Sequence, residues 1–585
     1  MFITLSNIWH LERVENIIYI VSNRNFYWLT KKGEIYVAFK KLYVSELENV
    51  RPILRQTKLV FPFYHTHSLA QENMSYAIYK QDCWATEIQK QVVFFSIKLS
   101  ERQMKITNIL CGEPSQISWY DILQKIELFA RSYFIPTIHL TFSAQGPLFD
   151  WLVANDYQPV KQGLTKKLSY NTALVLSGGG ARGAYQIGAW RALKSLNISF
   201  SMITSTSVGA LNAGLIMMDD ENMAQQIWYR ISTEQILAFP KAADDNHSFK
   251  QLRQQLRSLG LSAVKDKGVS TLPLQQMLKQ TLDEKTLLAS SIKLYICTTR
   301  LRGLKEKVVA VKPTSDAWKW LTASAAFFPA MQPMNIKGED YIDGGYRNDF
   351  PLDVALLKGA KECICIDAQG PGIRKKNINT ENIPTITLRS PWSLGSFLLF
   401  DSQRSKINEQ LGYLETMKYF HFYTGFWYTF TTEVDWQTEW QAFILTLSSQ
   451  KASRLQDKAF WQKFYKLYEK KVPLESAGEA FVELIGRFLE LPPNKVYTKS
   501  QFLAALVEGK ENVTQPFEVT LSFIEWLEIF HQNYSLLSKK KQFLLFEELL
   551  EKGIKIPESL IEKSSVLFVA VKFFSFLKKK STKNA

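Results

Sequence analysis

The chain has 585 residues, of which 46% are hydrophobic and 22% are charged, a balance that is ordinary for folded domains and excludes wholesale disorder. Since a domain usually holds roughly 100 to 200 residues, about three domains are expected. Lys and Arg number 71 against 55 Asp and Glu, and the net charge of +16 favours anionic partners such as acidic lipid headgroups. Nucleic acid is not an expected partner, because neither zinc-finger spacing nor an RNP-type aromatic motif is found.

The five cysteines are scattered and include no C-x-x-C pair, which fits the reducing cytosol. The first residues lack the basic segment, apolar segment and cleavage site of a secretory signal. No apolar run reaches the roughly 18 to 20 residues that span a bilayer. We therefore expect a cytoplasmic protein with peripheral contact at the inner face of the membrane. His65 and His67 have no partner at ligand spacing, so neither a metal nor a cofactor is predicted.

Residues 1–170 combine strand-like and helical patterns and are predicted to form an α+β domain. The expected strands are 92–98, 105–110, 137–141 and 164–168, and the expected helices are 119–133 and 146–155. This β-β-α-β-α-β order resembles the C-terminal half of GNAT-type acetyltransferases. The glycine-rich loop with which that family binds acyl-CoA phosphates is not recognisable between Cys111 and Trp119. A degenerate, non-catalytic version of that fold is therefore expected.

From about residue 171 the pattern changes to alternating strands and helices, which predicts an α/β domain over residues 171–430. Strands are expected at 173–176, 200–204, 293–299, 308–311, 362–367 and 385–389, and helices at 184–196 and 208–218. Such alternation indicates a mainly parallel sheet with helices on its faces. The polar, helical segment 219–290 is expected to cover the functional site of this domain.

Residues 431–585 are predicted to form a helical domain with a basic C-terminal tail. Amphipathic helical periods occur at 477–491, 499–508, 521–534 and 541–552. Segment 564–577 is apolar except for Lys572, and it is followed by Lys578, Lys579 and Lys580. Two interpretations stay open. The segment contacts an anionic membrane, or its helix packs onto the helical domain and leaves a solvated lysine tail.

A glycine-rich loop, Ser177-Gly178-Gly179-Gly180-Ala181-Arg182-Gly183, lies between an expected strand and an expected helix. Backbone N–H groups in such a loop can converge on one anion, helped by the helix N-terminus. Its G-x-G-x-x-G spacing also occurs in dinucleotide-binding folds, which place an acidic residue at the end of the second strand. The second strand expected here, 200–204, carries no carboxylate, so a dinucleotide site is disfavoured.

A candidate nucleophile follows that second strand, in Ser205-Thr206-Ser207-Val208-Gly209-Ala210. A serine on a strand-to-helix turn between small residues is typical of a nucleophile elbow. The turn is sharp, so bulky residues two positions either side of Ser207 would collide with the adjoining strand or helix. Ser207 would present its hydroxyl at the start of a helix, where the helix dipole favours developing negative charge.

A candidate base lies in Tyr341-Ile342-Asp343-Gly344-Gly345-Tyr346, where a carboxylate ends a strand-like run. The adjacent Gly344 and Gly345 would let Asp343 approach another loop closely. A free Asp has a pKa near 4, so burial is needed to make this carboxylate a useful base near neutral pH.

These three elements, G-G-G-x-R-G, a G-x-S-x-G-like elbow and D-G-G, occur in an order that resembles the patatin-like phospholipase family. The resemblance covers roughly a third of the chain and implies a three-layer α/β/α catalytic domain that hydrolyses acyl esters of lipids, phospholipase A or lysophospholipase in type. It also implies a catalytic dyad of Ser207 and Asp343 without histidine. The implied oxyanion hole lies in the loop of Gly178, Gly179, Gly180, Arg182 and Gly183, with Gly179 and Gly180 as donors and Arg182 supporting the loop.

Three alternatives stay open at this point. The first position of the elbow is Ser205, where the family usually has glycine, and this departure leaves open an inactive core that serves as a membrane-associated scaffold. A Ser-His-Asp triad would recruit a distant histidine, for which His247 in the insertion is the candidate. An acetyltransferase run by residues 1–170 is the third alternative, and the missing phosphate-binding loop argues against it.

Overall fold

The computed structural model describes residues 11–14, 17–22, 25–30, 39–42, 47–100, 103–142, 145–236, 269–311, 316–380, 383–447, 455–472, 474, 477–511 and 537–584. The chain divides into two compact units. Unit 1 consists of Met1–Ile187, Leu193–Arg389 and Ser396–Ser405, and unit 2 consists of Gly188–Ala192, Ser390–Gly395 and Lys406–Ala585. The three domains expected from the sequence stay a prediction.

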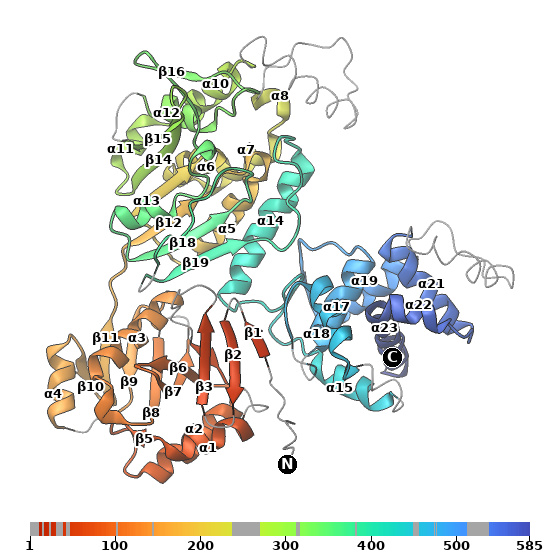
Figure 1. The fold of residues 1–585 in the computed structure, drawn as a ribbon. Helices are drawn as coiled ribbons and strands as arrows, with labels where there is room; N and C mark the ends of the chain where they lie inside the picture. The colour runs from red at the N-terminus through yellow and green to blue at the C-terminus, as the bar shows by residue number, and fades with distance from the viewer. Residues whose placement is uncertain are drawn as a thin grey trace, which may run out of the picture. The chain divides into compact units, whose positions relative to one another are not determined.

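The N-terminal part of unit 1 is built on a sheet with the strand order β10-β11-β9-β8-β7-β6-β4, with β5 paired to β8 (Figure 1). A separate antiparallel sheet has the order β1-β2-β3. Its elements are β1 (Leu11–Val14), β2 (Ile17–Ser22), β3 (Asn25–Thr30), β4 (Lys40–Lys41), α1 (Leu47–Gln56), β5 (Lys58–Leu59), α2 (His67–Tyr79), β6 (Cys83–Ile88), β7 (Gln91–Leu99), β8 (Gln103–Cys111), η2 (Pro114–Gln116), α3 (Trp119–Ser132), β9 (Thr137–Leu140), α4 (Pro147–Ala154), β10 (Gln158–Val160) and β11 (Gly163–Lys167).

The expected β-β-α-β-α-β order is confirmed by β7, β8, α3, β9, α4 and β11. Helix α3 buries Ile122, Ile126 and Phe129, which lie three or four positions apart and therefore share one face of the helix. The GNAT-like interpretation of this part stays a prediction.

The central part of unit 1 contains a sheet with the order β16-β17-β14-β13-β12-β18-β19, to which β15 adds at β14. Its elements are β12 (Thr172–Leu176), η3 (Gly180–Arg182), α5 (Ala184–Ser195), β13 (Met202–Thr206), α6 (Val208–Met217), α7 (Glu221–Arg230), α8 (Thr233–Ile236), α10 (Leu272–Thr281), α11 (Glu284–Ala289), β14 (Lys293–Arg300), β15 (Lys305–Val311), α12 (Ala317–Ala325), β16 (Met334–Ile336), β17 (Glu339–Asp343), η4 (Gly344–Tyr346), α13 (Leu352–Leu357), β18 (Glu362–Asp367) and β19 (Thr385–Arg389).

The predicted mainly parallel α/β sheet is confirmed, because β14, β13, β12, β18 and β19 run parallel to one another. Strands β15 and β17 pair with β14 in the antiparallel direction. Every residue of β12, β13 and β18 is buried, as expected for strands covered on both faces. On one face, α13 packs Leu352 and Ala355 against Val175 and Cys363. The second strand, expected at 200–204, lies two residues further along the chain, at Met202–Thr206.

The register of the central sheet brings two distant loops to the same level. Thr206 pairs with Cys297 on β14, and Thr298 pairs with Asp343 on β17. Ser207 and Asp343 therefore meet across β14, from the strands on either side of it. The glycine loop follows β12, the other neighbour of β13. The glycine loop, the Ser207 turn and the Asp343 loop therefore lie at the same end of the sheet's strands.

Unit 2 is largely helical, as predicted for the C-terminal region. Its elements are α14 (Ser402–Tyr419), which begins in unit 1, β20 (Thr429–Phe430), α15 (Gln437–Thr446), α17 (Lys458–Tyr468), α18 (Gly478–Phe488), β21 (Val496–Tyr497), α19 (Lys499–Glu511), α21 (Lys539–Glu551), α22 (Glu558–Lys563) and α23 (Ser565–Asn584). The helix expected at 521–534 lies outside the described residues. None of the helices in the described ranges is long and apolar enough to cross a membrane.

Helix α23 supplies much of the hydrophobic core of unit 2, among α17, α18, α21 and α22 (Figure 1). Its residues Val566 and Phe573 are buried in the same cluster as Phe481 of α18. Beyond them, Lys578 forms ion pairs with Glu547 at 2.9 Å and with a second glutamate of α21 at 2.8 Å. The apolar segment expected at 564–577 thus packs against the helical region.

Candidate active site

Ser207 occupies the turn between β13 and α6, in a backbone conformation with φ of 55° and ψ of −126° that residues other than glycine rarely adopt. Gly209 permits this sharp turn, because a Cβ there would lie 2.5 Å from the carbonyl oxygen of Leu176. Ser205 is buried, with its Oγ 3.4 Å from the carbonyl oxygen of Tyr295. The elbow therefore accommodates a serine at the position where the resembled family usually has glycine.

Asp343, the last residue of β17, contacts Ser207 directly. The Ser207 hydroxyl donates to Asp343 Oδ2 over 2.5 Å, and the backbone N–H of Gly345 donates to Asp343 Oδ1 over 2.7 Å. Burial raises the pKa of Asp343 to about 7, and the charge of Asp349 adds to the rise, while the two hydrogen bonds oppose it. The carboxylate can therefore accept a proton near neutral pH.

Of the five loop residues predicted to form an oxyanion hole, three use their backbone N–H within the fold. The N–H of Gly178 donates to the carbonyl oxygen of Asp349, that of Arg182 to Gly179, and that of Gly183 to Gly180. Gly179 and Gly180 line the cavity beside Ser207, and their N–H groups donate to no acceptor in the described part of the chain.

The side chain of Arg182 donates to the carbonyl oxygen of Gln369 and does not line the cavity. This contact agrees with a supporting position beside the loop. Both glycines that follow Asp343 are part of the site. Gly345 supplies the N–H that donates to Asp343. Gly344 lies so close to β14 that a Cβ would be 2.2 Å from the carbonyl oxygen of Cys297.

Two residues near Ser207 are absent from the sequence-based site. Asp349 is buried, lines the cavity and has its pKa raised to about 6 by burial, with Arg374 opposing the rise and Asp367 adding to it. Ser324 accepts the backbone N–H of Ser207. The position of Asp349, six residues after Asp343, was the available signal for it. Ser324 lies on α12, among the small residues Ala323 and Ala325.

A cavity of about 550 Å³ opens above Ser207, Asp343 and the glycine loop. Its walls are mostly apolar and include Leu211, Ile236, Leu274, Phe327, Phe397 and Phe400. Ile236 and Leu274 belong to the segment that was expected to cover the site, and both contribute to the wall. A mostly apolar cavity with a few polar groups, Ser207 and Asp343 among them, suits a ligand that has an acyl chain and a carbonyl group.

No histidine lines this cavity in the described residues. His247, the candidate for a triad, lies outside the described residues. In the same described part of the chain, no group of His, Cys, Asp and Glu side chains is arranged to hold a metal ion.

The sheet topology, the serine turn and the apolar cavity define the central region as an α/β domain with a nucleophile elbow at Ser207. Residues 174–356 match the family model of patatin-like phospholipases, which confirms the resemblance for this part of the chain.

Curated relatives match about a third of the chain. The chain is 30% identical over 197 residues to patatin-like phospholipase domain-containing protein 7 of Rattus norvegicus, which covers 33% of this chain and 13% of that protein. It is 25% identical over 194 residues to lysophospholipase NTE1 of Mycosarcoma maydis, which covers 33% and 9%. The chain thus spans a small part of the length of these relatives. Among solved structures, VipD of Legionella pneumophila aligns at 12% identity and a TM-score of 0.25, over 73% of this chain and 88% of that one.

Proposed function

We propose that the protein is a lipid acyl-hydrolase that cleaves carboxylic esters of phospholipids or lysophospholipids. The observation that carries this proposal is the hydrogen bond from Ser207 Oγ to the buried carboxylate of Asp343 beside an apolar cavity. The names of the relatives support the substrate class, since they include a phospholipase-domain protein and a lysophospholipase.

In the proposed mechanism, Ser207 is the nucleophile and Asp343 is its base. Asp343 takes the hydroxyl proton as Ser207 Oγ attacks the ester carbonyl. The C–O bond to the alcohol then breaks, and Asp343 gives this proton to the departing alcohol. Water then attacks the acyl-enzyme, with Asp343 again as base, and releases the fatty acid. The raised pKa of Asp343 supports this role, because a base near neutral pH transfers protons most effectively when its pKa is close to the working pH.

The tetrahedral intermediate carries a negative oxygen, for which Gly179 and Gly180 are the proposed donors. Their N–H groups lie at the cavity and have no acceptor in the described part of the chain, so they are available to an oxyanion. One such donor stabilises a transition state by about 3 kcal/mol. Gly178, Arg182 and Gly183 are assigned to holding the loop in shape.

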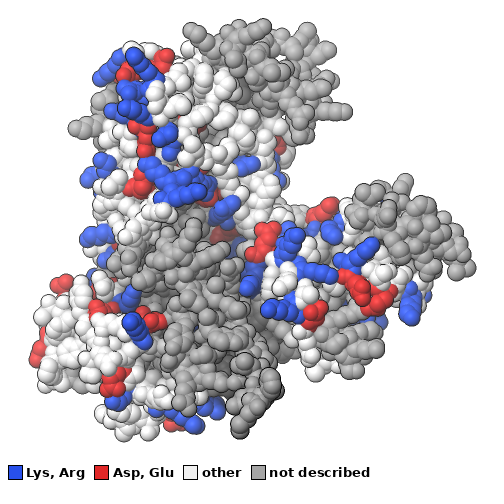
Figure 2. Space-filling view, viewed as in Figure 1, with Lys and Arg blue, Asp and Glu red and all other residues white. Residues whose placement is uncertain are grey.

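Contact with an anionic membrane through the lysines after Leu577 is a further part of the proposal. The apolar side chains of α23 are buried in unit 2, so the support for it is charge alone, with Lys579 exposed. On the face shown in Figure 2, Lys and Arg lie close to Asp and Glu, so the positive surplus is spread among acidic groups.

Co-sedimentation with anionic vesicles tests the membrane contact without removing the buried helix. Lys579→Glu is expected to weaken binding more than Lys90→Glu, which reverses one exposed charge in the N-terminal part. Equal binding of the two variants would contradict contact through the tail.

A fluorophosphonate probe tests the hydrolase. Labelling of the wild type that is lost in Ser207→Ala, and kept in Ser290→Ala outside the cavity, supports the proposal. An unlabelled wild type would favour the scaffold alternative. A lipid panel then compares turnover: Asp343→Asn is expected to be inactive, and an active Asp343→Asn beside an inactive His247→Ala would favour a triad.

A further inference from the structure

The segment from Asp367, the last residue of β18, to Arg374 is here called the β18 strap. It lies between the glycine loop and the Asp343 loop. The N–H of Gly370 donates to the carbonyl oxygen of Gly178 over 3.1 Å, and the N–H of Ile373 donates to that of Gly345 over 2.7 Å. One segment is therefore hydrogen-bonded to both loops that flank Ser207.

The strap touches these loops at van der Waals distance. A Cβ on Gly370 would lie 2.6 Å from the carbonyl oxygen of Gly178, and a Cβ on Gly372 would lie 2.7 Å from that of Gly345. With no spare space at either point, a displacement of the strap would move both loops.

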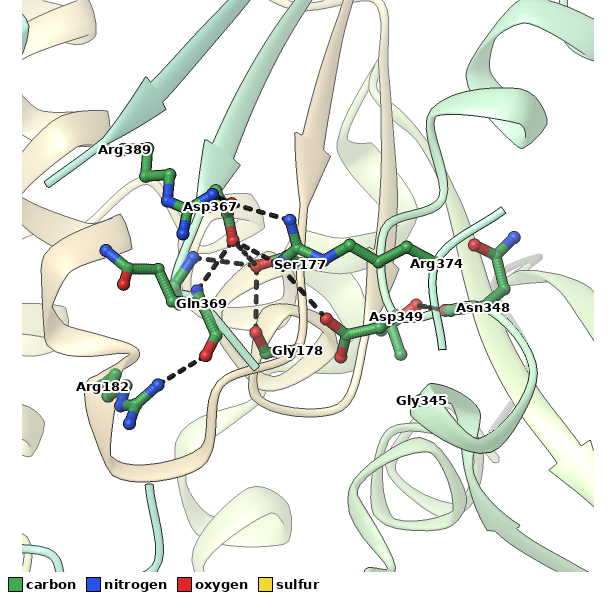
Figure 3. A network of polar contacts seen from close by, with 12 residues as sticks. Ser177, Gly178, Arg182, Gly345, Asn348, Asp349, Asp367, Gln369, Arg374 and Arg389 are labelled. Atoms are coloured by element: carbon green, nitrogen blue, oxygen red, sulfur yellow. Dashed lines mark hydrogen bonds and ion pairs between the residues drawn. The ribbon is translucent and has the colours of Figure 1, made fainter. Parts of the chain in front are cut away.

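Arg374 ends the strap and contacts two buried carboxylates (Figure 3). Its guanidinium makes two hydrogen bonds to Asp367, of 2.8 and 2.7 Å, and Nη2 lies 3.6 Å from Asp349 Oδ2. Asp367 and Asp349 are 1% and 2% exposed. Because a buried carboxylate is costly without a counter-charge, the arginine stabilises both.

Each of the two aspartates is also hydrogen-bonded to the glycine loop. The carbonyl oxygen of Asp349 accepts the N–H of Gly178 over 3.0 Å, and Asp367 Oδ1 accepts the hydroxyl of Ser177 over 3.4 Å. The N–H of Ala368, beside Asp367, donates to Ser177 Oγ over 2.8 Å. The guanidinium of Arg374 is thus connected to the glycine loop through both Asp349 and Asp367 (Figure 3).

We propose that Arg374 is a positioning residue for the hydrolysis, which holds Asp367 and Asp349 together so that the strap fixes Gly179 and Gly180 relative to Ser207. This inference rests on the proposed function. Displacement of a reacting or stabilising group by about 1 Å can slow catalysis about 100-fold, so a contact remote from the ester can control turnover.

Arginine suits this position because its planar fork donates two parallel hydrogen bonds to one carboxylate and keeps an edge for the second. Lysine supplies the charge but not the fork, and glutamine supplies neither the charge nor the fork. Arg389 provides a matched control. Its Nη1 lies 3.9 Å from Asp367 Oδ2 and its side chain is 59% exposed, and among the described residues it forms no ion pair with Asp349.

The test compares steady-state kinetics of the full-length wild type, Arg374→Gln, Arg374→Lys and Arg389→Gln on one ester substrate. Arg374→Gln is expected to lower kcat about 10- to 100-fold with KM nearly unchanged, because oxyanion contacts act in the transition state. Arg374→Lys should recover part of the loss, and Arg389→Gln should stay within about twofold of the wild type.

The outcomes separate this inference from the proposed function. An active wild type with unchanged kcat in Arg374→Gln overturns the inference alone, as does an equal loss in Arg389→Gln. If Arg374→Gln does not fold, Arg374→Lys decides: a lower kcat at unchanged KM and melting temperature supports positioning, and wild-type kcat overturns it. A wild type without Ser207-dependent activity overturns the proposed function and this inference together.

Discussion

The hydroxyl of Ser324 accepts a hydrogen bond from the backbone N–H of Ser207 over 2.9 Å. The same hydroxyl donates to the carbonyl oxygen of Cys297 over 2.6 Å, and Ser324 is fully buried. One side chain of α12 therefore ties the strained serine turn to β14. The N–H of Ser207 stands before the first turn of α6 and has no intrahelical acceptor, so Ser324 supplies one.

Replacing Ser324 by alanine is expected to loosen this turn. The buried N–H of Ser207 and the carbonyl oxygen of Cys297 would each lose a partner, at a cost of about 1 to 3 kcal/mol. Turnover should fall together with the free energy of unfolding. Thr322→Ala is the matched control, since it removes a hydroxyl from the same helix that bonds within the helix. Equal turnover in the two variants would contradict the role of Ser324.

The pH dependence of turnover should follow the ionisation of Asp343. Burial raises the pKa of this carboxyl to about 7, and only the ionised form can accept the proton of Ser207. We expect kcat/KM to level off above pH 7 and to fall about tenfold per pH unit well below it. A pH–rate profile on a soluble ester checks this. A flat profile between pH 5 and 7 would exclude Asp343 as the base.

Asp343→Asn should stabilise the protein at neutral pH. A folded-state pKa of about 7 against an ordinary 3.8 means that the native carboxyl holds its proton more tightly than the unfolded one. Stability is therefore lost as pH rises from about 4 to 7, by up to about 4 kcal/mol. Asparagine does not ionise, so the free energy of unfolding of Asp343→Asn should exceed that of the wild type at pH 8, and by a smaller amount at pH 5. Denaturant unfolding at the two pH values measures this difference. A difference independent of pH would contradict the burial effect.

Gly209→Ala should disrupt the elbow. The new Cβ would lie 2.5 Å from the carbonyl oxygen of Leu176 and 2.7 Å from that of Ser177, and backbone atoms cannot move aside cheaply. We expect a loss of at least about 1 to 3 kcal/mol. Gly214→Ala in the same helix is the control, because its nearest neighbour is the flexible Leu282 side chain at 3.1 Å. The two variants are compared by thermal melting, and similar melting temperatures would show that the elbow tolerates a methyl group.

The N-terminal part of unit 1 is expected not to bind acetyl-CoA. In the loop after β8, the N–H of Glu113 donates to the Gln91 side chain over 2.7 Å, and that of Ile117 to the carbonyl oxygen of Pro114 over 3.3 Å. These two N–H groups already have acceptors within the fold, and the acidic side chain of Glu113 would repel the phosphates of acetyl-CoA. Calorimetric titration of the full chain with acetyl-CoA should show no saturable heat, and clear binding would overturn the degenerate interpretation.

The local motifs were readable from the sequence, and the contacts that support them were not. The expected strand 362–367 coincides with β18, and the expected Ser207 and Asp343 lie together. Ser324 and Ser207 are 117 positions apart, so no local pattern links them. Arg374 likewise acquires its contact with Asp349 from the path of a loop.

Helices α1 and α2 are among the elements that the sequence did not predict, and one strand boundary was placed too early, for physical reasons. Helix α1 contains Pro52, which normally ends a helix, and α2 exposes Tyr76 and Tyr79, which blurs its apolar period. Strand β13 continues through Ser205 and Thr206, which were expected in the turn after the strand. Both are fully buried.

The place of α23 in the core of unit 2 has a consequence for the order in which the chain folds during synthesis. Phe481 and Phe488 of α18 share a hydrophobic cluster with Val566 and Phe573, which leave the ribosome roughly 80 residues after α18. At about 5 to 20 residues per second, α18 waits roughly 4 to 16 s for this partner. During that interval the part of its apolar face that α23 covers lacks its partner, although Phe481 also packs against Trp440 and Phe464 of earlier helices. Nascent chains of this protein should therefore be clients of chaperones that bind aromatic and aliphatic segments.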